Sequence, residues 1–116
     1  MRLENCIFCK IANKEIGSEI VDERPTAIAF KDINPKAPVH ILIIPKEHVV
    51  SLDELGKNGC DVLRDVFSLI SDIAVSEGVA QSGYRVVVNI GEEAGQEVDH
   101  LHFHLLGGRF MAWPPS

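Results

Sequence analysis

The chain contains the stretch His100-Leu101-His102-Phe103-His104-Leu105-Leu106, in which histidines alternate with apolar residues. In a β-strand, successive side chains point to opposite faces of the sheet, so a period of two separates the two kinds of residue. We therefore predict a strand that places the three histidines on one face. The apolar residues between them would lie on the other face and pack in the core.

Three imidazoles on one face of a strand must share a site. A neutral imidazole near pH 7 can serve as a metal ligand, a general base or a nucleophile. The spacing alone does not choose among these roles. A single histidine on an apolar face is usually a satisfied core residue, but three in strict alternation favour a functional site.

The rest of the chain predicts an α+β fold with an antiparallel sheet of about five strands. Short β-rich runs bounded by turn residues indicate the strands, and these runs cover residues 19–22, 26–30, 39–44, 84–90 and 98–106. A helical turn is expected at residues 10–14.

Residues 51–54 have the spacing of a capping box, but Gly56 and Gly59 are expected to interrupt the helix that starts there, so the main helix is expected to begin near Asn58. Apolar residues then follow the three-and-four spacing of one helical face: Leu63, Val66, Phe67, Ile70, Ile73 and Ala74. Gly78 is the predicted stop. We expect this helix to pack on the sheet.

The composition bounds the class of protein. A length of 116 residues suits one core, so we expect a single domain over residues 1–116. A net charge of -6 argues against a nucleic-acid surface, although a nucleotide-sized anion needs only local donors. No apolar run is long enough to span a bilayer and the start lacks a signal-peptide pattern, so we expect a cytoplasmic protein with no membrane partner.

Cys6 and Cys9 have the two-residue spacing that lets two thiolates bind one tetrahedral ion. Three cysteines cannot all pair within the chain, which favours a reduced protein and raises the weight of a metal site. A lone Cys-x-x-Cys still needs two further ligands. The alternative is that both cysteines pack as small apolar residues, as we expect for Cys60.

A glycine-bearing loop at residues 91–97 precedes the histidine stretch. Gly91 and Gly95 allow the backbone to approach an anion closely, because glycine has no Cβ and tolerates positive φ. Such loops also commonly do no more than turn a hairpin.

The stretch at residues 100–106 resembles the His-φ-His-φ-His-φ-φ signature, where φ is apolar, of the histidine triad (HIT) family of nucleotide hydrolases and transferases. The resemblance extends over nearly the whole chain, through residues 30–35, 37–40, 44–49 and 107–115, and fits the Hint branch, the nucleoside phosphoramidases. It implies the HIT-like fold.

The resemblance implies that His102 attacks the α-phosphorus of a purine nucleoside 5′-phosphoramidate or an aminoacyl-adenylate. Water would then cleave the nucleotidyl-histidine and release AMP or GMP, with no cofactor for catalysis. The implied catalytic residues are His102, His104, His40 and Gln96. The implied nucleotide-binding residues are Phe8, Phe30, Asp32, Ile33, Leu42, Asn89, Gly95, Gln96, Glu97, His102 and His104.

Some of these residues have a plain structural explanation as well. Phe30 and Leu42 would also suit an ordinary core, and an aspartate after a strand, such as Asp32, is usually a turn residue. Two positions depart from the family pattern. Glu97 stands where many eukaryotic members carry a serine, which leaves the leaving-group preference open, and Asp99 replaces a common aromatic residue and is expected to face water.

Zinc-containing members of the family complete the cysteine pair with two histidines, at the positions of His48 and His100. By resemblance, the set Cys6, Cys9, His48 and His100 holds a structural zinc ion. A Cys₂His₂ site has no open coordination position, so it would fasten the N-terminal segment to the histidine stretch rather than activate water.

The resemblance also implies a homodimer, with the sheet extended across the two subunits and the tail at residues 109–116 at their interface. Two other functions stay open from the residues alone. The histidine row could ligate a catalytic metal ion directly, or the chain could be a non-enzymatic, zinc-stabilised module that binds nucleotides without turnover.

Overall fold

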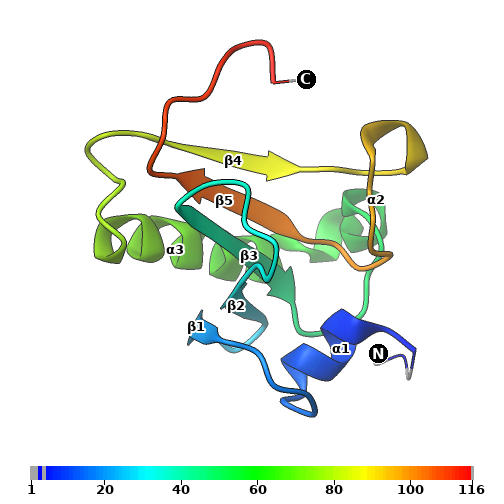
Figure 1. Cartoon of the computed structure of the whole chain (residues 1–116). Coiled ribbons are helices and arrows are strands. Elements are labelled where there is room, and N and C mark those ends of the chain that lie inside the picture. Colours follow the sequence, from blue (N-terminus) through cyan, green and yellow to red (C-terminus); the bar gives the residue numbers. More distant parts are fainter. Residues whose placement is uncertain (1–2, 4, 116) are drawn as a thin grey trace.

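The computed structural model describes residues 3 and 5–115 and, within them, a five-stranded sheet (Figure 1). The strands are β1 (Ile20–Glu23), β2 (Ala27–Lys31), β3 (Val39–Pro45), β4 (Tyr84–Val88) and β5 (Phe103–Gly107). The helices are α1 (Ile7–Ala12), α2 (Leu52–Leu55) and α3 (Cys60–Ser76), with 3-10 turns η1 (Gly56–Asn58) and η2 (Glu92–Ala94). The predicted α+β class, with one main helix and a short N-terminal helix, is confirmed.

The strands are antiparallel and lie in the order β1-β2-β3-β5-β4. α3 belongs to the connection between β3 and β4, after which the chain forms the β4 and β5 pair. β3 and β5 therefore meet in the middle of the sheet although they are distant in sequence. In their register Leu42 lies opposite His104, and His40 lies opposite Leu106.

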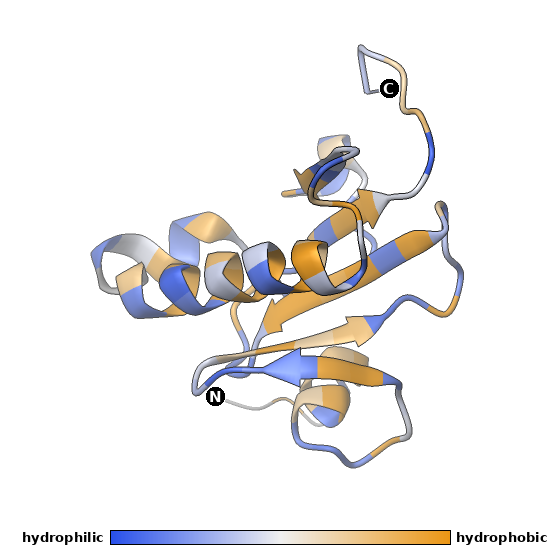
Figure 2. Cartoon of the chain, turned by 90° about the vertical axis from the view of Figure 1, so that its left-hand side faces the viewer, coloured by the Kyte–Doolittle hydropathy of each residue, from blue (hydrophilic) through white to orange (hydrophobic). Residues whose placement is uncertain are grey.

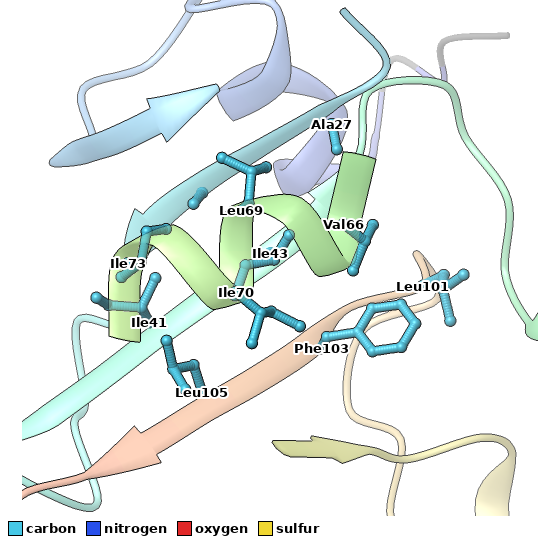
Figure 3. Packing of buried hydrophobic residues seen from close by; sticks show 11 residues of the cluster. Ala27, Ile41, Ile43, Val66, Leu69, Ile70, Ile73, Leu101, Phe103 and Leu105 are labelled. Atoms are coloured by element: carbon cyan, nitrogen blue, oxygen red, sulfur yellow. The ribbon is translucent and has the colours of Figure 1, made fainter. Parts of the chain in front are cut away.

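Side chains of α3 form the main core with one face of the sheet (Figure 3). Val66, Leu69, Ile70 and Ile73 recur with the spacing of one helical face and are buried. They pack against apolar residues of the strands and of the histidine stretch: Ala27, Ala29, Ile41, Ile43, Leu101, Phe103 and Leu105. Each large side chain buried in this way contributes ~1.5–3 kcal/mol to folding.

A smaller core lies under α1, where Phe8 and Ile11 pack with strand residues. The strand residues of this cluster are Ile28, Phe30, Leu42 and Ile44. Because the two clusters share β2 and β3, these strands are buried on both faces and read as continuous apolar runs rather than alternating ones. Figure 2 shows apolar runs along the strands that α3 covers.

The histidine stretch is only partly a strand. β5 begins at Phe103, whereas the sequence predicted a strand over residues 98–106. Just before β5, the N–H of Leu101 donates to the carbonyl of Val49 at 2.7 Å, outside the β3 and β5 ladder. The predicted alternation of faces nevertheless holds, because the apolar residues enter the α3 core and the histidine after Leu101 contacts Phe8 of α1.

α1 begins at Ile7, three residues before the predicted start at Lys10. Cys6 is its N-cap, and the Sγ atom of Cys6 accepts a hydrogen bond from the N–H of Cys9 at 3.4 Å. A cysteine cap is not among the Ser, Thr, Asp and Asn signals that mark a helix start in a sequence. The first turn of α1 is therefore built by the same cysteine pair that we predicted to bind a metal ion.

The main helix differs from the prediction in three respects. It begins at Cys60 rather than near Asn58, and Cys60 is exposed rather than packed. Phe67 is 51% exposed, although its ring forms a T-shaped contact with that of Phe103 at 5.8 Å between centroids. The predicted stop is confirmed, because Gly78 follows the C-cap with a φ of 78°.

The other boundaries agree within one or two residues, and β4 ends at Val88 rather than at residue 90. At the predicted capping box, Ser51 is the N-cap of α2 but makes no side-chain cap bond. Glu54 supplies the other half of the box in shifted form, because its carboxylate accepts from the N–H of Val50 at 2.9 Å.

The tail beyond β5 runs past the β4 edge and leaves the sheet (Figure 1). Arg109 donates from Nε to the carbonyl of Lys36, and Arg85 donates to the carbonyl of Ala112. The side chain of Phe110 nevertheless stays 92% exposed. Residue 116 of the predicted interface tail lies outside the described residues. No helix in the described part of the chain combines the length and the apolar character needed to cross a membrane.

Candidate functional site

The centre of the sheet brings His40 and His104 into contact. The two residues are diagonal neighbours on one face of the β3 and β5 pair, two positions apart in the register. His40 Nε2 lies 2.9 Å from His104 Nδ1, and the two rings are 5.2 Å apart between centroids. Strand pairing thus joins a histidine from the middle of the chain to the histidine stretch.

The hydrogen bonds of these two rings determine where their protons lie. The backbone N–H of Lys36 donates to His40 Nδ1 at 3.0 Å, so the proton of a neutral His40 must lie on Nε2. His40 Nε2 then donates to His104 Nδ1, which leaves the proton of His104 on its own Nε2. Within the described residues, this buried Nε2 has no hydrogen-bond partner.

Both rings are held neutral near pH 7. Burial lowers the pKa of His104 to about 4, and the neighbouring His102 and His40 act in the same direction. Burial also lowers the pKa of His40, against the opposing effect of the Asp32 carboxylate. A buried N–H donor without a partner costs free energy, so His104 is ready to donate to an acceptor supplied by a ligand.

His102 has its proton fixed in the opposite sense. Its Nδ1 lies 2.7 Å from the main-chain carbonyl oxygen of His100, and a carbonyl can only accept. The proton is therefore on Nδ1 and the lone pair on Nε2. The ring is buried and meets Phe8 edge-on at 5.1 Å and His104 at 5.1 Å between centroids.

A cavity of about 270 Å³ lies beside His102 and His104. All five predicted base and ribose residues line it, together with Glu97: Phe8, Phe30, Asp32, Ile33 and Leu42. Phe30 and Leu42 are at the same time buried in the α1 core, while Ile33 is 86% exposed at the rim. An apolar wall with a few polar groups is typical of a small-molecule site.

Asp32 combines a turn role with a place in the cavity. One carboxylate oxygen accepts from the N–H of Asn34 at 2.8 Å, as expected for a turn aspartate. The other lies 3.4 Å from His40 Nε2. The side chain is only partly buried and so keeps acceptor capacity toward a ligand.

A second, wider hollow of about 1060 Å³ adjoins the first and shares Asp32, Glu97 and His104 with it. Asn89 lines this hollow, as do Arg85 and Trp113. The structure therefore places Asn89 and Glu97 along the same hollow as His40 and His104.

Gly95 and Gln96 are not among the residues that line either hollow. The Gln96 amide donates to the carbonyls of Val50 and Val98 and accepts from the N–H of Gly91. These contacts join the two ends of the loop to each other and to Val50, which precedes α2. Gly95 has a φ of 78° and ends η2, so a positive φ explains this glycine.

The four predicted metal ligands converge at one place. One donor atom from each of Cys6, Cys9, His48 and His100 lies within 4.8 Å of the others. Cys9 Sγ is 3.3 Å from His48 Nδ1, and Cys6 Sγ is 3.3 Å from His100 Nδ1. A tetrahedral zinc ion with ordinary bond lengths places such sulfur and nitrogen atoms about 3.5 Å apart, so the donor set fits zinc.

The ring of His100 is oriented for this role. Its Nε2 donates to the carbonyl of Pro45 at 2.8 Å, which leaves the Nδ1 lone pair facing the two sulfur atoms. Burial lowers the pKa of His100 to about 4, so the ring is neutral. Burial also raises the pKa of the Cys6 thiol; a bound cation would oppose that effect.

A second group, Asp32, His40 and His104, also has its donor atoms close together. Here the proton arrangement disfavours a metal ion, because the Lys36 N–H occupies Nδ1 of His40 and keeps a proton on Nε2. The three histidines at 100, 102 and 104 do not share one metal centre. His100 and His104 belong to different groups, and His102 belongs to neither among the described residues.

Two residues at the site, Lys36 and Arg85, were not predicted from the sequence. Lys36 acts through its backbone N–H, which every non-proline residue has. Arg85 reaches the tail, where its guanidinium lies 6.0 Å from the Trp113 ring centre and donates to Ala112. The two prolines flanking Lys36 marked only a loop.

The profile of the HIT domain matches residues 13–111, and the chain belongs to this family. The fold described above is that of HIT proteins of known structure. The crystal structure of a HIT family hydrolase from Legionella pneumophila superposes with a TM-score of 0.92 at 45% identity, covering 97% of this chain and 100% of that one.

Two sequence relatives have informative names. The purine nucleoside phosphoramidase of Escherichia coli is 42% identical over 106 residues, covering 91% of this chain and 89% of the relative. The 14 kDa zinc-binding protein of Zea mays is 46% identical over 112 residues, covering 95% of this chain and 87% of the relative. Together with the structural neighbour, these relatives support a hydrolase.

Proposed function

We propose that this protein is a nucleotide hydrolase that cleaves purine nucleoside 5′-phosphoramidates or aminoacyl-adenylates at the α-phosphate, with His102 as nucleophile. One observation carries the proposal. His102 Nδ1 is bonded to the His100 carbonyl, so Nε2 keeps its lone pair beside a cavity and beside the unpartnered N–H of His104. The phosphoramidase among the relatives supports the substrate class.

The reaction would run as a double displacement. His102 Nε2 forms a bond to the α-phosphorus, the bond from phosphorus to the leaving group breaks, and a departing amine takes up a proton from the solvent, to which the attacking water of the second step returns one. Water then attacks the nucleotidyl-histidine, breaks the phosphorus–nitrogen bond and releases AMP or GMP. His102 is restored as neutral imidazole.

His104 and His40 would stabilise the charge that develops on the phosphate. The Nε2–H of His104 has no partner in the described chain, so a phosphate oxygen can accept from it. His40 fixes that proton by donating to the opposite nitrogen at 2.9 Å. A donor that is already oriented stabilises a transition state without the cost of reorganisation.

The 270 Å³ cavity would hold the nucleoside. Its apolar wall of Phe8, Phe30, Ile33 and Leu42 suits a purine base, and the Asp32 carboxylate suits the ribose hydroxyls. Asn89 and Glu97 line the adjoining hollow and would face the phosphate and the leaving group. Gly95 and Gln96 are proposed to shape this end through the loop backbone.

We propose that Cys6, Cys9, His48 and His100 bind a structural zinc ion. The spacing of the donor atoms and the lone pair of His100 that faces the sulfur atoms support this, as does the zinc-binding relative. With four protein ligands the ion would have no open position, so it would hold the N-terminal segment in place and take no part in the chemistry.

We also propose a homodimer in which the sheets of two copies join. β4 is an edge strand with its outer backbone groups available, and the nearby tail exposes the rings of Phe110 and Trp113. Each copy would be one domain over residues 1–116, in the cytoplasm. Light scattering that gives the mass of one chain would contradict the dimer.

The test of the function is hydrolysis of adenosine 5′-phosphoramidate by the wild type and by His102→Ala. We expect AMP release by the wild type and a loss of at least about a thousandfold in the variant, as for other nucleophile deletions. Equal activity in the two proteins would reject His102 as nucleophile. A wild type that binds AMP but never turns over would instead indicate a nucleotide-binding module.

A further inference from the structure

The first turn of α1 carries an aromatic ring between two candidate metal ligands. Cys6 is the N-cap of this turn and Cys9 is the third helical residue, and the N–H of Cys9 donates to the sulfur of Cys6. Phe8 lies between them in sequence and is 7% exposed. Its ring meets the ring of His102 edge-on at 5.1 Å and that of His100 at 5.9 Å.

The Phe8 ring is one connection between the cluster and His102, and His100 provides a second. Its Nδ1 faces both sulfur atoms, and its Nε2 donates to Pro45, the last residue of β3. The side chain is fully buried. These contacts fix the residue whose carbonyl oxygen accepts from His102 Nδ1 at 2.7 Å.

The two routes act on different properties of the His102 ring. The His100 carbonyl selects the tautomer and directs the Nε2 lone pair away from itself. The Phe8 ring limits how the His102 ring can tilt. Both neighbours depend on side chains of the same cluster. None of the four cluster residues lines the nucleotide cavity, whereas Phe8 does.

We propose that the Cys6, Cys9, His48 and His100 cluster is a positioning device for the nucleophile, acting on His102 through the His100 carbonyl and the Phe8 ring. The inference rests on the proposed function for its kinetic consequence. The cluster ligands are then positioning residues, and occupancy of the cluster sets how well His102 is aligned for attack.

His48 offers the sharpest test because it belongs to the cluster but touches neither the nucleotide cavity nor His102 in the described contacts. His48→Ala removes a ligand, whereas His48→Cys replaces it with another that zinc accepts. Both variants should keep the α3 core, which contains none of the four ligands.

Three quantities are measured on the wild type and both variants: zinc content, the steady-state constants for adenosine 5′-phosphoramidate, and the ¹⁵N signals of His102 at one fixed pH. For His48→Ala we expect loss of zinc, a kcat lowered about ten- to a hundredfold, as misplacement by about 1 Å can cause, and a mixture of His102 tautomers. KM should change much less than kcat. His48→Cys should restore all three.

A His48→Ala protein that loses zinc and melts earlier, yet keeps its kcat and a single His102 tautomer, would overturn the proposal, because the cluster would then be a structural staple only. If His48→Ala does not fold, the Phe8→Leu variant tests the proposal, since it leaves all four ligands in place. A Phe8→Leu protein that keeps its zinc but has a lower kcat would support positioning of His102 by the Phe8 ring. A higher KM with an unchanged kcat in this variant would refute that role of Phe8. Absence of turnover in the wild type would reject the proposed function, while the ¹⁵N signals would still test the positioning.

Discussion

His102 Nδ1 lies 2.7 Å from the carbonyl oxygen of His100, while His104 Nδ1 lies 2.9 Å from Nε2 of His40. The first contact places the proton of His102 on Nδ1 and its lone pair on Nε2. The second, together with the Lys36 N–H, places the proton of His104 on Nε2. The two neighbouring rings thereby present one lone pair and one donor to a reacting phosphate.

His40 is predicted to act by fixing the His104 proton. His40→Ala should lower kcat/KM about ten- to a hundredfold, because His104 can then adopt either tautomer. His40→Gln keeps an amide N–H donor and should retain more activity than the alanine variant. Equal losses in the two variants, measured with adenosine 5′-phosphoramidate, would show that donation to His104 is not what His40 contributes.

Acid should destabilise the protein in part through His104. Its pKa falls from an ordinary 6.5 to about 4 on folding, so the unfolded chain binds the extra proton first as the pH falls. The stabilisation is full above pH 6.5 and declines between pH 6.5 and 4. Between pH 7 and 5 we expect a loss of about 1–2 kcal/mol from this residue in urea unfolding.

The matched control for the pH prediction is His104→Gln, which cannot titrate in this range. Its free energy of unfolding should fall less than that of the wild type between pH 7 and 5, with both proteins at the same zinc occupancy. Identical pH dependence of the two proteins would contradict the assignment. The quantity compared is the change of the free energy of unfolding with pH, because the substitution also changes its value at pH 7.

Zinc should be bound at one ion per chain and should depend on Cys9 but not on Cys60. Cys9 is buried in the ligand cluster, whereas Cys60 is exposed at the start of α3 and does not belong to it. Cys9→Ala should lose the metal and lower Tm by at least ~5 °C, as expected for a loss of about 1 kcal/mol or more in a chain of this size. Cys60→Ala should keep both; equal metal content in the two variants would refute the site.

Asp32 should contribute to nucleotide affinity through the ribose. Asp32→Asn should weaken AMP binding about ten- to a hundredfold, since a hydrogen bond to a charged acceptor contributes ~1.5–3 kcal/mol when it is lost. Binding of 2′,3′-dideoxy-AMP should change little, because this ligand lacks the hydroxyls. Titration calorimetry measures both, and equal weakening for the two ligands would assign Asp32 to its turn with Asn34 instead.

The alternation at residues 100–106 was enough to predict which side chains face the α3 core and which face the site, because a period of two determines the face even where strand pairing is absent. It could not predict where the strand begins. That depends on the Leu101 N–H, which bonds to Val49 instead of a neighbouring strand. Similarly, helical spacing predicted the stripe through Val66 and Ile73, but it could not predict that Phe67, at the side of the stripe, stays half exposed, because exposure depends on tertiary packing.

The sequence was enough to predict which side chains form the candidate site. It was not enough to predict which ring nitrogen of each histidine carries the proton. Cys6, Cys9, His48 and His100 could be grouped from the family resemblance, and they do converge. The tautomers of the histidines depend on main-chain groups of Lys36, His100 and Pro45, which have no signature in a sequence. The side chain of Gln96, in turn, is used inside its own loop.

The central claim is that the nucleotide becomes covalently attached to His102. The most direct measurement is rapid quenching of the enzyme with adenosine 5′-phosphoramidate, without acid, followed by peptide mass spectrometry. We predict an adenylyl group on the peptide that contains residues 100–104, located on His102 by fragmentation and absent in His102→Ala. AMP formation by active wild type with no adduct at any time point, or an adduct on another residue, would contradict the account.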